Sequence, residues 1–135
     1  MLHTLHKTES LKGDVLVPIK TALQQRFSAC DGWKMYNKYN WSNKCYDLIL
    51  QNDSQERTKR VVVMVNLDKV VSKRHYDSIE SLTSRLNQGS ANVLKKILIV
   101  DNPSSFEAAP EDIELISISD LLRENLRATE PKLVA

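Results

Sequence analysis

The segment Val61-Val62-Val63-Met64-Val65 is the sequence feature that most limits the fold. It holds five consecutive apolar residues, four of them β-branched. Branching at Cβ favours the extended backbone of a strand. A run without polar alternation is typical of a strand buried on both of its faces. The segment is therefore predicted to be the central strand of a sheet that is covered on both sides.

Apolar spacing elsewhere predicts the other elements. A helix should begin at Asp14, with Pro18 in its first turn, and end near residues 31–32, because apolar residues recur there at helical spacing. A second helix, marked by Tyr76 to Leu86, should stop at Gly89. Ser119 should cap a final helix. Strands are expected at residues 33–39, 45–50, 61–65, 96–100 and 114–118, with loops at 51–60 and 101–110.

This order, α-β-β-β-α-β followed by β-α, predicts an α/β fold with a mixed sheet. Its first strands should be antiparallel and the crossover strands parallel. A length of 135 residues suits one domain, and 41% hydrophobic residues suffice for a core. We expect a lead-in at residues 1–13, the domain at 14–127 and a flexible tail at 128–135.

The sequence favours a cytoplasmic protein without a membrane partner. No apolar run approaches the ~18 residues of a membrane span. The N-terminal residues lack the apolar stretch of a signal peptide. Cys30 and Cys45 are too few for a disulfide framework, and we expect both to be buried, reduced thiols.

Charge is distributed unevenly along the chain. Residues 1–74 hold 13 Lys and Arg against seven Asp and Glu, whereas residues 75–135 hold six against ten. A basic half is typical of a surface that faces phosphates. It is equally consistent with a solvated face that has no partner.

Two local patterns and the order of elements carry a resemblance to a known family. Tyr46-Asp47-Leu48-Ile49-Leu50 looks like the second-strand segment of the PD-(D/E)xK (restriction-endonuclease-like) superfamily, in which an acid is followed by apolar residues. Residues 113–122 look like the closing strand and helix of its Mrr-like branch. The resemblance covers about residues 14–126. It implies a restriction-endonuclease-like core and Mg²⁺-dependent nuclease chemistry.

Such chemistry needs one acid on the second strand and an acid-x-lysine on the third. The carboxylates hold Mg²⁺, and the lysine helps to activate water and stabilise charge on the phosphate. Asp47 matches the first acid and is the candidate metal ligand. The acid-x-lysine positions hold Met64 and Asn66, which supply neither a ligand for Mg²⁺ nor a positive charge. The chain therefore resembles a degenerate member of the superfamily that requires no cofactor.

A relocated active site is the alternative. Asp68 and Lys69 follow the third strand, and Glu80 lies in the next helix, so these residues would act with Asp47 on Mg²⁺. In an ideal strand Asp68 would lie about 7 Å beyond Asn66, too far for a direct replacement at one metal. A lone Asp47 is more often a hydrogen-bonded or solvent-facing strand residue than part of a relocated metal site.

Aromatic and basic residues alternate in residues 33–44. Such a segment can stack bases and contact phosphates, form a protein interface, or cover the sheet as core. Basic residues of the following loop would extend the same edge. The candidates for contact with nucleic acid, a protein partner or a second copy are Trp33, Lys34, Tyr36, Lys38, Trp41, Lys44, Arg57, Lys59 and Arg60.

The three histidines form no catalytic group in the sequence. His3 and His6 are three residues apart in the lead-in, where they can touch a metal adventitiously. His75 stands at the start of a helix beside Lys73 and Arg74, and we expect it to be exposed. The sequence thus favours a non-catalytic binding or accessory module.

Overall fold

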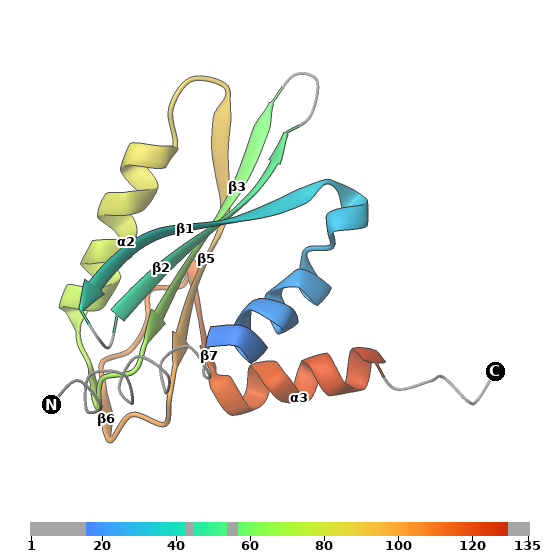
Figure 1. Cartoon of the computed structure of the whole chain (residues 1–135). Helices are drawn as coiled ribbons and strands as arrows, with labels where there is room; N and C mark the ends of the chain where they lie inside the picture. Colours follow the sequence, from blue (N-terminus) through green and yellow to red (C-terminus); the bar gives the residue numbers. More distant parts are fainter. Residues whose placement is uncertain (1–15, 43–44, 54–56, 130–135) are drawn as a thin grey trace, which may run out of the picture.

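A mixed five-stranded sheet forms the middle of three layers in the computed structural model, which describes residues 16–42, 45–53 and 57–129 (Figure 1). The strands lie in the order β1-β2-β3-β5-β7. The first three are antiparallel, and β3, β5 and β7 are parallel, so the predicted mixed α/β sheet is confirmed. The bounds are β1 Trp33–Ser42, β2 Cys45–Asp53, β3 Thr58–Asn66, β5 Ala91–Val100 and β7 Ile113–Ser117.

Helices cover both faces of this sheet (Figure 1). The N-terminal helix, residues 16–26, and α3 (Ile118–Thr129) lie on one face, and α2 (Lys73–Leu86) lies on the other. Each face has its own apolar core, because alternate side chains of a strand point to opposite sides. Val61, Val63 and Val65 pack under the N-terminal helix, whereas Val62 and Met64 pack under α2.

The central position of β3 is confirmed. Every residue from 61 to 66 is buried, with β2 on one side and β5 on the other. The parallel step from β3 to β5 passes through α2, as expected of a crossover helix. The β-branched run therefore lies in the environment that its composition predicts.

Several predicted boundaries are wrong. The first helix ends at residue 26 rather than near 31–32, and a separate 3₁₀ turn, η1 (Ala29–Asp31), follows it. Gly32 has φ of 97°, a left-handed conformation that ends this turn and starts β1. Ser119 does not precede α3, which begins at Ile118; instead the Ser117 hydroxyl accepts a hydrogen bond from the Asp120 backbone N–H.

A second, two-stranded sheet was not predicted, and one of its strands lies in the loop expected at residues 101–110. β4 (Val70–Val71) pairs in parallel with β6 (Ser105–Phe106). The Lys69 carbonyl accepts hydrogen bonds from the backbone N–H groups of Ser104 and Ser105. This pairing ties the chain that leaves β3 to the chain that leaves β5, and so fixes the approach to α2.

The predicted lead-in at residues 1–13, the Asp14 cap and residues 130–135 lie outside the described residues. α3 extends two residues into the segment predicted as the tail. Within the described ranges, no helix is long and apolar enough to cross a bilayer.

Candidate functional site

Asp47 lies on the α2 side of the sheet and is the third residue of β2. It is 1% exposed, so its carboxylate does not face solvent. Cys45 and Ile49, which lie two residues before and two residues after Asp47, point to the same face of the sheet. The neighbour of Asp47 across the strands is Met64.

The third-strand positions lack the groups that Mg²⁺ chemistry needs. Met64 is fully buried in the core under α2, and its side chain shares the face of Asp47. Asn66 is fully buried and pairs with Cys45 across the strands. Its Oδ1 accepts a hydrogen bond from the Cys45 thiol at 3.4 Å and one from the Asp68 backbone N–H at 3.0 Å. Asn66 is therefore committed to local hydrogen bonds at the end of β3.

Asp68 does not continue the line of β3, in contrast to the ideal-strand prediction. The strand ends at Asn66, and the bond from the Asp68 N–H to Asn66 Oδ1 turns the chain. The Asp68 carboxylate consequently approaches His75, with 3.6 Å between Asp68 Oδ2 and His75 Nε2. Cys45 completes this group: one ligand atom from each of the three residues lies within 4.8 Å of the others.

The prediction that His75 is exposed is wrong. Its relative exposure is 5%, because the first turn of α2 directs its side chain toward the sheet and Asp68 rather than toward solvent. Its Nδ1 lies 3.1 Å from the Ser72 backbone nitrogen, which donates to it, and 3.4 Å from the Ser72 hydroxyl. The imidazole is thus held on one side by the residue preceding the helix and faces Asp68 on the other.

The start of α2 is anchored by the segment that follows β6. A Glu107 carboxylate oxygen accepts the Lys73 backbone N–H at 2.7 Å, which satisfies one of the open donors of the first helical turn. The Tyr76 hydroxyl donates to the Glu107 carbonyl at 2.7 Å. Burial, together with the Glu107 charge, raises the pKa of Tyr76, so this phenol remains a donor at neutral pH. These contacts hold the first turn of α2, which also carries His75.

Two residues of the relocated-site alternative are engaged elsewhere. Glu80 accepts a hydrogen bond from the Lys96 ammonium at 2.9 Å, on the part of α2 that covers β5. Lys96 also pairs with Asp112, whose pKa is lowered by that hydrogen bond. Lys69 is exposed, and its carbonyl is part of the β4–β6 connection. Of the residues named for the relocated site, only Asp68 belongs to a cluster of ligand-type side chains among the described residues.

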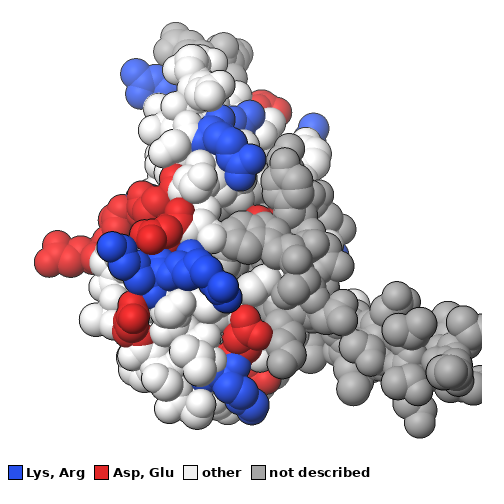
Figure 2. All heavy atoms as spheres, turned by 90° about the vertical axis from the view of Figure 1, so that its left-hand side faces the viewer, with Lys and Arg blue, Asp and Glu red and all other residues white. Residues whose placement is uncertain are grey.

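Basic candidates gather around the turn between β2 and β3. Lys34 on β1 and Arg60 on β3 both pair with Gln51 of β2. Their side chains therefore point to the same face of the sheet, and their backbones are about 10 Å apart, two strand spacings. Arg57 and Lys59 are exposed nearby, and Lys59, which pairs with Asn52, points to the opposite face of the sheet. Figure 2, which views the α2 side, shows Lys and Arg at the upper end of the molecule, whereas acidic and basic groups interleave lower down.

Arg60 differs from its neighbours because its guanidinium is bonded within the fold. It donates to the Leu86 carbonyl at 2.6 Å and to Gln51 Oε1 at 3.0 Å. The first bond satisfies a carbonyl at the end of α2, where a positive charge is also favourable. Arg60 therefore stabilises the packing of α2, whereas the other three candidates, Lys34, Arg57 and Lys59, are exposed.

The aromatic segment divides between core and surface. Trp33 packs against the core under the N-terminal helix and meets Phe27 edge-to-face, with ring centroids 5.1 Å apart. Tyr36 is 44% exposed on the α2 side of the edge strand β1. The side chains of Lys38 and Trp41, and Lys44 as a whole, lie outside the described part of the chain.

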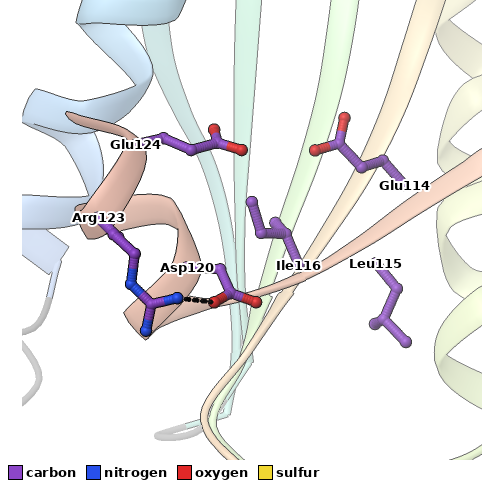
Figure 3. A pocket seen from close by; sticks show the side chains of 6 residues that line it. All are labelled: Glu114, Leu115, Ile116, Asp120, Arg123 and Glu124. Atoms are coloured by element: carbon purple, nitrogen blue, oxygen red, sulfur yellow. Dashed lines mark ion pairs between the residues drawn. The ribbon is translucent and has the colours of Figure 1, made fainter. Parts of the chain in front are cut away.

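An open hollow between β7 and α3 is lined mainly by charged residues (Figure 3). Its carboxylates are already paired: Glu114 with Arg26 and Lys95, Glu124 with Arg26, and Asp120 with Arg123. Burial raises the pKa of Glu114, but hydrogen bonds from Lys95 and Arg26 outweigh it and lower the pKa below its ordinary value. The ion pairs of Arg26 with Glu114 and Glu124 connect the N-terminal helix to β7 and to α3. The residues that line the hollow include none of the candidates named from the sequence.

The group of Cys45, Asp68 and His75 was not predicted from the sequence. Its members are separated by 23 and 7 positions and match no ligand spacing of a known metal motif. The chain turn at Asn66 and the crossover into α2 bring them together. Cys30, in contrast to the prediction, is exposed, so Cys45 is the buried thiol.

Comparisons with known proteins add no assignment. A scan against protein-family models and searches of curated proteins and of solved structures found no match.

Proposed function

We propose that this chain is a restriction-endonuclease-like domain that binds nucleic acid without cleaving it. The observation that carries the proposal is the character of the β2–β3 face. Asp47 is present, but the residue opposite it is the buried, apolar Met64. A hard cation such as Mg²⁺ prefers several oxygen ligands, and a thioether does not replace a carboxylate.

The order of strands supports the family part of this proposal. Three antiparallel strands, a crossover helix and further parallel strands make up the arrangement that the resemblance implies. Helices on both faces agree with the same architecture. These features support a restriction-endonuclease-like scaffold in which Met64 and Asn66 stand where the family pattern has its acid and lysine.

The nucleic-acid part is supported by the exposed cations at the β2–β3 turn. Lys34 lies on β1, and Arg57 and Lys59 lie at the start of the β3 segment, so the three cations occupy the same end of the sheet. Asp53 is close by, but its carboxylate accepts hydrogen bonds from Gln51 and Thr58. Exposed lysine and arginine groups neutralise phosphates and release counterions, which makes such binding sensitive to salt.

Fluorescence anisotropy with labelled single-stranded, duplex and branched DNA tests this proposal, with EDTA present to remove metal ions. We expect binding at low salt that weakens steeply between about 50 and 200 mM salt. The double substitution Lys34→Glu/Lys59→Glu should reduce affinity at least tenfold. It should also lower the magnitude of the salt slope by about two, roughly one for each lost phosphate contact.

The matched control is Lys69→Glu/Arg74→Glu, which makes the same change of charge with exposed residues at the opposite end of β3. This variant should keep most of the affinity. Equal losses in the two variants would mean that only net charge matters, and the assigned surface would be wrong. Absence of salt-sensitive binding to all three DNA forms would contradict the proposal and favour a protein partner.

A further inference from the structure

Three side chains with the chemistry of transition-metal ligands meet at the end of β3. Cys45 comes from the first residue of β2, Asp68 from the turn after β3, and His75 from the first turn of α2. The cysteine and histidine are buried, and the aspartate side chain is 33% exposed. We propose that Cys45, Asp68 and His75 bind a transition-metal ion of the zinc type. The site is distinct from the nucleic-acid surface proposed above.

The spacing of the ligand atoms suits one tetrahedral ion. Bonds of about 2.0–2.1 Å to nitrogen and oxygen and about 2.3 Å to sulfur place neighbouring ligand atoms about 3.3–3.6 Å apart. His75 Nε2 and Asp68 Oδ2 are already 3.6 Å apart. All three ligand atoms lie within 4.8 Å of one another. A movement of the side chains by about 1 Å would bring these atoms to the spacing of a tetrahedral site.

The kinds of ligand determine the class of metal. Thiolate and imidazole favour zinc, cobalt and related ions, whereas Mg²⁺ and Ca²⁺ favour sites made of oxygens. Three protein ligands leave one tetrahedral position for water or another ligand, which is the open arrangement. Asp68 forms the accessible side of the group, because the other two ligands are buried. An ion therefore enters from the Asp68 side.

Binding changes the protonation of the ligands. Cys45 binds as thiolate and releases its thiol proton to solvent, because the thiolate is the metal ligand. Neutral His75 accepts the Ser72 N–H at Nδ1 and so carries its proton on Nε2. For Nε2 to bind the ion, that proton moves to Nδ1, which then donates to the Ser72 hydroxyl at 3.4 Å, while the Ser72 backbone N–H loses Nδ1 as its acceptor and turns to water. Ser72 thereby becomes the outer partner that orients the histidine.

Asn66 is a second independent indication of a site at this place. It is fully buried, and its Nδ2 has no hydrogen-bond partner among the described residues. Its Oδ1 contacts the Cys45 thiol and the Asp68 backbone N–H, so the amide lies between two of the three ligands. An unsatisfied buried donor is costly. A metal-bound water would supply the acceptor that this amide lacks.

Zinc and cobalt binding to the full-length chain tests the proposal. We expect one zinc ion per chain, a zinc-dependent rise in Tm, and a thiolate-to-cobalt charge-transfer band in the near ultraviolet. Loss of an outer partner typically weakens metal binding ~10–100-fold. Cys45→Ser and Asp68→Ala, which remove a ligand, should therefore weaken zinc affinity by more than about 100-fold. Ser72→Ala should weaken it ~10-fold.

The matched control for the thiol is Cys30→Ser, because Cys30 is the exposed cysteine. The control for adventitious histidine ligands is His3→Ala/His6→Ala. Both controls should retain the cobalt band and the wild-type zinc affinity. Asp68→Ala provides a variant at a partly exposed position, where folding is not at risk from a buried substitution.

Two outcomes would overturn the metal site. One is zinc affinity that persists in Cys45→Ser but falls in His3→Ala/His6→Ala, which would assign binding to the chain terminus. The other is the absence of any zinc-dependent rise in Tm or cobalt band in the wild type. Neither outcome affects DNA binding measured in EDTA, so failure of this site and failure of the proposed function are distinguishable.

Discussion

Met64→Glu is expected to destabilise the protein by at least about 3 kcal/mol at neutral pH. The side chain is 0% exposed, lies in the core under α2 and is the cross-strand neighbour of the buried Asp47. A new carboxylate there loses its hydration and lies next to a second acid. Urea unfolding followed by far-UV circular dichroism measures the loss. The control Met64→Leu keeps the volume and should cost less than about 1.5 kcal/mol.

The same variant tests whether β2 and β3 retain a hidden Mg²⁺ site. Met64→Glu restores the acid at the third-strand position of the family pattern. If Asp47 and the new glutamate were arranged as metal ligands, Mg²⁺ would recover the lost stability by binding the folded state. We expect no such recovery, because Asn66 is bonded to Cys45 and Asp68 and the surrounding surface is apolar. Recovery by Mg²⁺ would contradict our interpretation of this face.

Leu98→Ala is expected to destabilise the protein by about 2–5 kcal/mol. Leu98 lies on β5 between Met64 of β3 and Leu115 of β7, and its side chain is fully buried under α2. Truncation removes apolar burial and leaves a cavity in the middle of the sheet, where neighbours on both sides restrict relaxation.

The matched control is Leu94→Ala on the same strand. Leu94 is 57% exposed, so the same chemical change should alter the free energy of unfolding by no more than about 0.5 kcal/mol. Chemical unfolding of the two variants under identical conditions compares them. Similar losses at the two positions would show that β5 is not the buried inner strand described above.

The sheet could be predicted from the sequence because its signals are local. The run from Val61 to Val65 has the composition of a strand buried on both faces, and it occupies that place. The apolar spacing of α2 and the order of strands were likewise sufficient for the α/β class. Boundaries were less predictable. Phe27 continued the apolar spacing of the first helix, but the helix ends at residue 26 and the chain then forms the η1 turn.

The candidate metal site could not be predicted, because tertiary structure creates it. His75 has basic neighbours in the sequence, which favoured an exposed position, but the first turn of α2 directs it under the sheet. Asp68 was placed by assuming a straight strand, whereas Asn66 accepts its N–H and turns the chain. Asn66 itself was considered only as the position of a missing lysine. Its role as a hydrogen-bonding residue between Cys45 and Asp68 depends on the strand register.

The basic surface was predicted in part. Lys34 of the segment that alternates aromatics with lysines, and Arg57 and Lys59 of the following basic stretch, are exposed at one end of the sheet. Arg60 was grouped with them because sequence neighbours share a loop, but its guanidinium reaches the last turn of α2. Trp33 similarly belongs to the core, because its side of β1 faces the N-terminal helix.

A cleavage assay is the most direct measurement of the central claim, that the domain binds without hydrolysis. Single-stranded, duplex and branched DNA would be incubated with the wild type or Asp47→Ala, in Mg²⁺ or in Mn²⁺. Because Met64 and Asn66 supply neither a carboxylate nor a positive charge, we predict no cleavage by the wild type above the level of Asp47→Ala. Metal-dependent cleavage that Asp47→Ala abolishes would contradict the claim.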